Sequence, residues 1–237
     1  LSAEETELLG RIARDDVQLR VDASVRDDGE GRAVSLRVRN ELTRDIYSTI
    51  ARSRRIVGPM EELLGGEVYH YHHKLIFKDQ QTAGAWAWHQ DYGYWYDYAC
   101  LYPLLASCLI AIDPATRQNG CLQVLAGSHH MGRIEHGIKG DQTGADPERV
   151  AAIQQQLDTV PVTLSPGDAV FFHCNLLHRS DANTTPDPRW AFICCYNAAR
   201  NNPYQPIRHP QYSPLDVLED DQVLEVGQAQ WSQMAES

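Results

Sequence analysis

A series of short aromatic and β-branched runs, beginning at Glu67, is the feature that most limits how this chain can fold. Seven runs, divided by turn residues, occur within about 130 residues: EVYHYHHKLIFK, AWAWHQDY, CLIAID, CLQVLAG, VPVTL, AVFFH and RWAFICCY. Each has the length and composition of a β-strand. Strands at this density are typical of a β-sandwich or barrel rather than of alternating strands and helices. We therefore expect a mainly β core at about residues 66–200.

Helical patterns flank this core. Ser2 and Glu5 have the spacing of a capping box in front of the amphipathic run EETELLGRIARD. The run DIYSTIARSRRIVGPMEELLG also has a helical period, with a break expected at its Gly-Pro pair, whereas RAVSLRVRN alternates like a strand. An all-β unit of 237 residues commonly forms one domain. We expect a single domain, with a helical part at about 1–65 and a C-terminal tail at about 201–237.

One long connection, residues 131–147, interrupts the series of strands. It contains glycine, lysine and aspartate and has no clear period. In a compact domain a connection of this length is commonly a lid or a binding loop. We expect it to help define the substrate, and PERVAAIQQQL behind it predicts a short helix.

The composition argues against several classes of function. The chain has 32 acidic and 21 basic residues, a net charge of −11, which repels nucleic acid and anionic membranes. No apolar run approaches the roughly 18 residues that a membrane span requires. The six cysteines include no CxxC pair, so we expect buried thiols in a reducing, cytoplasmic compartment. These properties favour a small molecule as the partner.

The run AWAWHQDYGYW contains the first candidate site. His89 and Asp91 are two residues apart, and on a strand such residues point to one face. An imidazole and a carboxylate placed in this way can converge on one metal ion. The competing interpretation is a pair of side chains on a solvated strand face.

The second half of the chain strengthens the metal hypothesis. GDAVFFHCNLLHRSDANTTPDPRW predicts a strand, a histidine at its end and a returning strand that opens with Arg189, 11 residues after His178. Two histidines and one carboxylate on one face of an iron leave room for a bidentate co-substrate and O₂, as in Fe(II) oxygenases. A nearby guanidinium offers a planar fork for a distal carboxylate. The pattern predicts His89, Asp91 and His178 as metal ligands and Arg189 as the 2-oxoglutarate anchor.

Other histidines remain open as alternatives. His70 and His72 are also two apart on one predicted strand. His173 precedes His178 by five residues and could replace it, although an odd spacing puts the two on opposite faces unless the chain turns at Asn175. Most of the ten histidines must be structural or solvated.

Four motifs in order, WHQD, NGCLQVLAGSHH, PGDAVFFH and LHRSDANTTPDPRW, resemble the phytanoyl-CoA dioxygenase family, which includes ectoine hydroxylase. The resemblance covers about residues 69–196, roughly half of the chain. It implies a double-stranded β-helix, a cupin-like jelly roll that is mainly β with flanking helices. It also implies non-haem Fe(II), with 2-oxoglutarate and O₂ consumed. Its metal ligands fall on His89, Asp91 and His178, and its carboxylate-binding arginine falls on Arg189.

The resemblance also suggests further co-substrate contacts. Ser180 matches a position that can hydrogen-bond the same carboxylate, and Gln90 matches a position beside the co-substrate. A lysine that helps bind the keto acid falls on Lys78, with Lys74 on the same strand face as the competitor. A tryptophan of some relatives is replaced here by Ala106 or Ser107.

An aromatic run directly follows the HxD motif. Tyr92, Tyr94 and Trp95 could serve as ordinary core packing, yet residues just beyond a metal strand commonly line the substrate pocket. We predict these three, with His72, as substrate-binding residues. Arg189 has an alternative of its own, an exposed strand arginine paired with an aspartate such as Asp187 or Asp181.

The activity that follows is hydroxylation of a C–H bond of a small or medium organic molecule, with release of succinate and CO₂. Because Asp91 is present, the halogenase variation, in which a small residue replaces the carboxylate, is disfavoured. One alternative is a non-catalytic, cupin-like metal- or ligand-binding protein. Another is a zinc hydrolase with the same ligands, which gives no role to Arg189.

Overall fold

The computed structural model describes residues 1–80 and 83–236, and its core is two antiparallel sheets. The larger sheet has the order β1 (Ser24–Asp27), β2 (Ala33–Arg39), β3 (Val68–Lys78), β12 (Arg189–Ala198), β5 (Leu105–Ala111) and β10 (Ala169–His173). The smaller sheet has the order β4 (Trp86–His89), β11 (His178–Ser180), β6 (Leu122–Leu125) and β9 (Thr159–Val162). Successive core strands alternate between the sheets, apart from β6 and β9. This topology is the predicted jelly roll.

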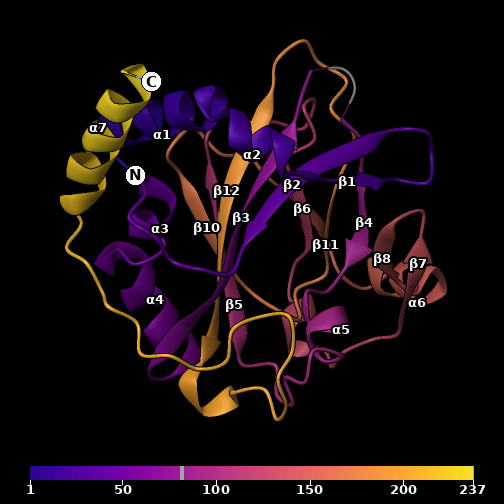
Figure 1. The fold of residues 1–237 in the computed structure, drawn as a ribbon. Coiled ribbons are helices and arrows are strands. Elements are labelled where there is room, and N and C mark those ends of the chain that lie inside the picture. Colours follow the sequence, from indigo (N-terminus) through magenta and orange to yellow (C-terminus); the bar gives the residue numbers. More distant parts are fainter. Residues whose placement is uncertain (81–82, 237) are drawn as a thin grey trace.

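Helices cover the outer face of the larger sheet (Figure 1). They are α1 (Ala3–Asp15), α2 (Val17–Val21), α3 (Ile46–Ile50), α4 (Arg54–Leu64) and α7 (Gln222–Ala235). Apolar side chains of α1, α3, α4 and α7 form one buried cluster with the outer side chains of β3, β5 and β12. The capping box of α1 forms as predicted, with Glu5 N–H donating to Ser2 Oγ and Ser2 N–H donating to Glu5 Oε2.

The remaining short elements are α5 (Tyr92–Trp95), β7 (His136–Lys139), β8 (Gln142–Ala145), α6 (Pro147–Gln154) and two 3₁₀ turns, Ser128–His130 and Ala199–Asn201. The second of these turns directly follows β12 of the larger sheet. The connection at 131–147 is thus not wholly irregular, because β7 and β8 pair as a hairpin within it. In Figure 1 this hairpin and α6 lie on the side of the molecule opposite α3 and α4.

The pairing of β3 with β12 decides which side chains face the interior. Ile76 lies opposite Ala191, Lys74 opposite Ile193 and His72 opposite Cys195. The apolar members of these pairs belong to the buried cluster between the two sheets. Since directly opposite residues point to one face of a sheet, His72, Lys74 and Lys78 all face the interior.

A bulge in β3 corrects one alternative from the sequence. The register passes from Cys195 opposite His72 to Tyr196 opposite His70, which leaves Tyr71 as an extra residue. The extra residue changes the alternation, and His70 bonds instead to His73 (Nε2···Nδ1 3.0 Å). His70 and His72 therefore do not form an i, i+2 ligand pair.

The break that the sequence predicted at Gly58-Pro59 lies elsewhere in the structure. α3 ends at Ile50 and α4 begins at Arg54, whereas Pro59 lies inside α4. The separate strand β2 forms where the alternation predicted it. No helix among the described residues is long and apolar enough to cross a bilayer.

Candidate metal centre

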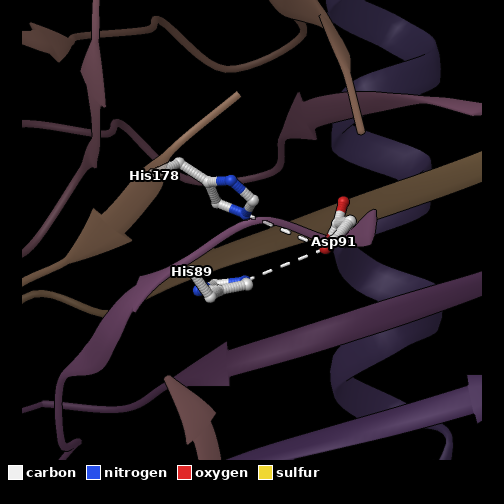
Figure 2. Close-up of side chains that lie close together, drawn as sticks. All are labelled: His89, Asp91 and His178. Atoms are coloured by element: carbon white, nitrogen blue, oxygen red, sulfur yellow. Dashed lines mark ion pairs between the residues drawn. The ribbon is translucent and has the colours of Figure 1, made fainter. Parts of the chain in front are cut away.

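Two neighbouring strands of the smaller sheet bring the two predicted histidine ligands together. His89 ends β4 and His178 begins β11, and the two residues are paired directly across the strands. Asp91 lies just past the end of β4, at the start of α5, so a turn and not strand alternation brings its carboxylate round. Asp91 Oδ1 is 3.8 Å from His89 Nε2 and 3.9 Å from His178 Nε2 (Figure 2).

Backbone carbonyls orient both imidazole rings. His89 Nδ1–H donates to Ala87 O at 2.8 Å, and His178 Nδ1–H donates to Leu176 O at 2.9 Å. Each Nε2 lone pair is thereby left free toward Asp91, which is how metal-binding histidines are commonly held. Burial, with the charge of His178, lowers the pKa of His89 to about 3, and burial lowers the pKa of His178. Both rings are thus neutral, the form that binds a metal.

The Asp91 carboxylate is held by two hydroxyl groups. Tyr94 Oη–H donates to Oδ1 at 2.5 Å, and Ser107 Oγ–H donates to Oδ2 at 3.2 Å. Burial acts to raise the Asp91 pKa, but the positive charge of Lys74, with the neighbouring imidazoles and the Tyr94 hydrogen bond as smaller causes, outweighs it and lowers the pKa. Asp91 is therefore ionised. Ser107 thus supports one of the three candidate ligands.

The donor set suits Fe(II). Ligand atoms of His89, Asp91 and His178 lie within 4.8 Å of one another, the one such group of His, Cys, Asp or Glu among the described residues. Two neutral imidazoles and one carboxylate form the facial triad of non-haem Fe(II) oxygenases. The alternative residue His173 does not join this group, and its Nδ1 accepts the Asn175 N–H at 3.1 Å.

A second polar cluster lies at the far end of β3 and β12. Arg189 pairs with Lys78 across these strands, and both side chains are buried. Arg189 Nη2 donates to Gly120 O at 2.7 Å, while its Nε has no partner. Lys78 Nζ donates to the Asp181 carbonyl, and Ser180 Oγ is buried without a partner. The alternative of an exposed arginine paired with an aspartate is wrong.

The two cations lack an anion. Neither Arg189 nor Lys78 forms an ion pair with a described carboxylate. Burial lowers the pKa of Arg189 to about 10, and burial together with the charge of Arg189 lowers the pKa of Lys78 well below its usual range. A buried charge without a counter-ion costs several kcal/mol on the order-of-magnitude scale. Such an arrangement suits an anionic ligand that brings the missing charge.

Lys74 lies on the same interior face, four residues before Lys78 along β3. It is half-buried, and its ammonium group forms no hydrogen bond or ion pair with a described residue. Of the causes that lower the pKa of Asp91, the charge of Lys74 is the largest. Lys78 instead lies close enough to Arg189 for the guanidinium charge to lower the pKa of Lys78. The two lysines thus serve opposite ends of the interior, Lys74 the metal end and Lys78 the arginine end.

The remaining predicted residues differ in how close they lie to the triad. Gln90 is buried, and its amide is committed to backbone groups, which favours a bracing role over co-substrate contact. Tyr92 Oη donates to Cys100 O at 3.1 Å, and Trp95 packs edge-on against Tyr71, so both lie in the core. Of the three aromatic residues, Tyr94 is the one whose side chain is seen to bond to the triad, through the Asp91 carboxylate.

One residue near the metal end of the interior was not predicted from the sequence. His209, in the tail, stacks on His72 with ring centroids 4.8 Å apart at 26°, and it lies 5.5 Å from the Tyr98 ring. Asn40, after β2, holds both the His209 ring and the preceding carbonyl group. The tail passes beside α5 before it reaches α7 (Figure 1). No local pattern indicates this contact, because the partners are more than 100 residues apart.

Comparisons with known proteins agree with this geometry. The family model for phytanoyl-CoA dioxygenase (PhyH) matches residues 2–191. L-proline trans-4-hydroxylase of Streptomyces griseoviridis is 30% identical over 70% of this chain and 68% of its own length. Ectoine dioxygenase of Halomonas elongata is 28% identical over 90% of this chain and 68% of its own.

Solved structures share the fold. EctD from S. alaskensis with bound Fe has a TM-score of 0.77 at 23% identity, over 92% of this chain and 80% of that one. The epimerase SnoN in complex with Fe³⁺, α-ketoglutarate and nogalamycin RO has a TM-score of 0.70 at 20% identity, over 92% and 90% of the two chains.

Proposed function

The chain belongs to the phytanoyl-CoA dioxygenase family, and from this membership we propose that His89, Asp91 and His178 hold the Fe(II) of a C–H hydroxylase. The enzyme class is that of the relatives, non-haem iron dioxygenases that depend on 2-oxoglutarate. Bound iron supplies the activation of O₂, coupled to conversion of 2-oxoglutarate into succinate and CO₂. The protein supplies neutral imidazoles and an ionised carboxylate in one place.

The observation that carries the proposal is the pair of buried cations without an anion. Arg189 and Lys78 lie in the interior that the triad also faces, and Ser180 adds an unpartnered hydroxyl group. We assign them to the far carboxylate of 2-oxoglutarate, because a guanidinium can bind a carboxylate through two parallel hydrogen bonds. A zinc hydrolase could use the same triad, but it leaves these cations without a function.

The substrate is a small organic molecule, as for the relatives named for L-proline and ectoine. We place it beside the triad, against Tyr94, His72 and His209. Tyr94 touches Asp91, and the ring contacts of His209 reach from Tyr98 to His72. This wall combines flat apolar faces with imidazole nitrogens, which suits a small polar ring or chain.

The test is 2-oxoglutarate turnover. The protein is loaded with Fe(II) and incubated in air with ascorbate and 2-oxoglutarate, with and without L-proline or ectoine. The succinate that forms is measured by mass spectrometry. We expect succinate in the presence of iron and none from Asp91→Ala. Binding of metal and 2-oxoglutarate without any succinate would favour the non-catalytic binder, and failure to bind 2-oxoglutarate would refute the proposal.

A further inference from the structure

Gln90 occupies the position between the first two residues of the triad, and all of its amide groups are engaged. Its Nε2 donates to Asn175 O at 2.9 Å and to Gly132 O at 3.1 Å. Its Oε1 accepts the Ile134 N–H at 2.9 Å. The side chain is fully buried, so the loss of any of these bonds leaves a polar group without water as a substitute.

His136, the first residue of β7, completes the contact from the other side. Its Nε2 accepts the Gln90 backbone N–H at 2.9 Å, and its Nδ1–H donates to Ile134 O at 2.8 Å. The ring lies so close to Gly93 that a Cβ at that position would overlap it. Arg133 donates to Gly93 O through Nε and Nη2 at 3.1 and 3.0 Å. The segment before β7 is thus fixed to both ends of the turn that carries Asp91.

The same segment is also tied to the strand of the third ligand. Asn175, three residues before His178, donates through Nδ2 to Met131 O at 3.2 Å. Leu177 N–H donates to Ser128 Oγ at 2.9 Å. The Gln90 amide therefore joins three pieces of chain: the His89 turn, the approach to His178 and the segment 128–136.

The hairpin that follows has little stability of its own. β7 and β8 have four residues each, most of their side chains are exposed or half-exposed, and Ile138 is 88% exposed. An isolated two-stranded hairpin is at best marginally stable in water. The order of this hairpin therefore depends on where it is attached, and one attachment is the Gln90–His136 contact.

We propose that Gln90 and His136 are positioning residues that hold the metal ligands in register and couple metal binding to the order of the β7–β8 hairpin. The inference rests on the proposed metal centre. Because coupling between two sites is reciprocal, a metal that favours the ordered triad must favour the docked hairpin, and a broken brace must weaken metal binding.

The experiment uses the full chain and Co(II) or Zn(II) as the metal, without turnover. Metal affinity is measured by titration, and hydrogen exchange is followed at residues 136–145 with and without metal. Gln90→Glu keeps the shape but places a carboxylate oxygen against two carbonyl groups. We expect its metal Kd to rise about 10- to 100-fold, the usual range for residues that support ligands. The wild-type hairpin should gain protection on adding metal, and the variant should not.

The matched control is Gln123→Glu in β6, whose amide contacts Arg179 and Asp181 and does not reach the segment 128–136. Its metal Kd should stay at the wild-type value. If Gln90→Glu does not fold, His136→Leu replaces it, and His136→Gln should rescue because its amide oxygen can accept the Gln90 N–H.

Three results would overturn the inference. One is a Gln90→Glu protein that is less stable both with and without metal but has an unchanged metal Kd, as expected of a purely structural residue. The second is wild-type protein in which metal does not change the hydrogen exchange of the β7–β8 hairpin. The third, wild-type protein that binds no metal at all, would also remove the proposed function, so the two failures are distinguishable.

Discussion

The two faces of β3 carry the same kinds of polar residue in different states. On the face toward the helices, His70 and His73 hydrogen-bond to one another, and burial lowers the pKa of each to about 3. On the face toward the interior, the ammonium groups of Lys74 and Lys78 form no ion pair with a described carboxylate. Each face also has one buried imidazole nitrogen without a described partner, His73 Nε2 on the outer face and His72 Nδ1 on the inner face. Burial alone therefore does not identify a binding site; what distinguishes the inner face is its two lysines without a counter-ion.

Two histidine pairs show the distinction in detail: the inner pair, His89 and His178, lies on β4 and β11 of the smaller sheet, and the outer pair, His70 and His73, lies on the outer face of β3. The rings of His89 and His178 are 4.1 Å apart, and those of His70 and His73 are 5.1 Å apart. In the first pair, backbone carbonyls take each Nδ1–H and leave both Nε2 atoms facing Asp91. In the second pair, one imidazole nitrogen bonds to the other imidazole. The pair at the candidate metal centre therefore differs in two ways: Asp91 lies between its two Nε2 atoms, and each Nδ1 has a backbone carbonyl as its own partner.

The largest expected effect is loss of the acid from the inner pair. Asp91→Ala should lower Fe(II) affinity by at least about 100-fold and abolish succinate formation, because removing a charged ligand exceeds the cost of removing a supporting residue. Metal titration and succinate analysis measure both effects. His73→Gln changes the outer pair and should leave Fe(II) affinity at the wild-type value. Equal losses from both variants would erase the distinction between the faces.

The next effect concerns the cations of the inner face. Arg189→Met should raise the Kd for 2-oxoglutarate by about 10- to 150-fold with unchanged iron affinity, because it removes a charge-assisted hydrogen bond worth about 1.5–3 kcal/mol. Calorimetric titration of the Zn(II)-loaded protein measures this Kd. Lys78→Met should weaken the binding of 2-oxoglutarate more than Lys74→Met does, since Lys78 lies beside Arg189. The reverse order would place the co-substrate carboxylate at the metal end.

The last effect belongs to the outer face and concerns stability as a function of pH, with no change in the affinity for metal or co-substrate. His70 and His73 stay neutral in the folded protein because of burial, His70 beside Arg52 and His73 beside Arg39, whereas an unfolded histidine binds a proton below about pH 6.5. The unfolded state thus takes up more protons, and stability falls as the pH drops from about 6.5 toward 3. Each histidine contributes up to about 1.4 kcal/mol per pH unit.

Urea unfolding of metal-free protein between pH 7.5 and 5 measures this slope. His73→Gln should make the slope shallower, and the exposed His130→Gln should leave it unchanged. Burial also lowers the pKa of His72, His89, His178 and His209, so His73→Gln removes one part of the slope. A slope that His73→Gln does not alter would mean that His73 does not contribute to the acid sensitivity.

Much of the fold could be predicted because its signals are local. The strands of the core follow from short β-branched and aromatic runs, and the α1 cap follows from Ser2 and Glu5. The strand β11 has only three residues and carries no period of its own. The hairpin at 136–145 was hidden because β7 is mostly exposed and the buried positions of β8 are Gln142 and Gly144, which give no apolar alternation.

The candidate triad was predictable from residue types and spacing, although the reason was partly wrong. His89 and Asp91 converge through a turn into α5, not through alternation on one strand. Gln90 illustrates the limit more clearly. The family resemblance implied a co-substrate contact, whereas its hydrogen bonds join segments about 40 and 85 residues away.

By itself the amino-acid order determined where strands form and which side chains have the chemistry for iron and a dicarboxylate, because these depend on neighbouring residues. Only the tertiary structure decided which polar groups meet: the bulge at Tyr71 that separates His70 from His72, the Arg189–Lys78 pairing and the stacking of His209 on His72. Such contacts depend on strand register and on packing between distant segments, where a shift of one residue turns a side chain to the opposite face.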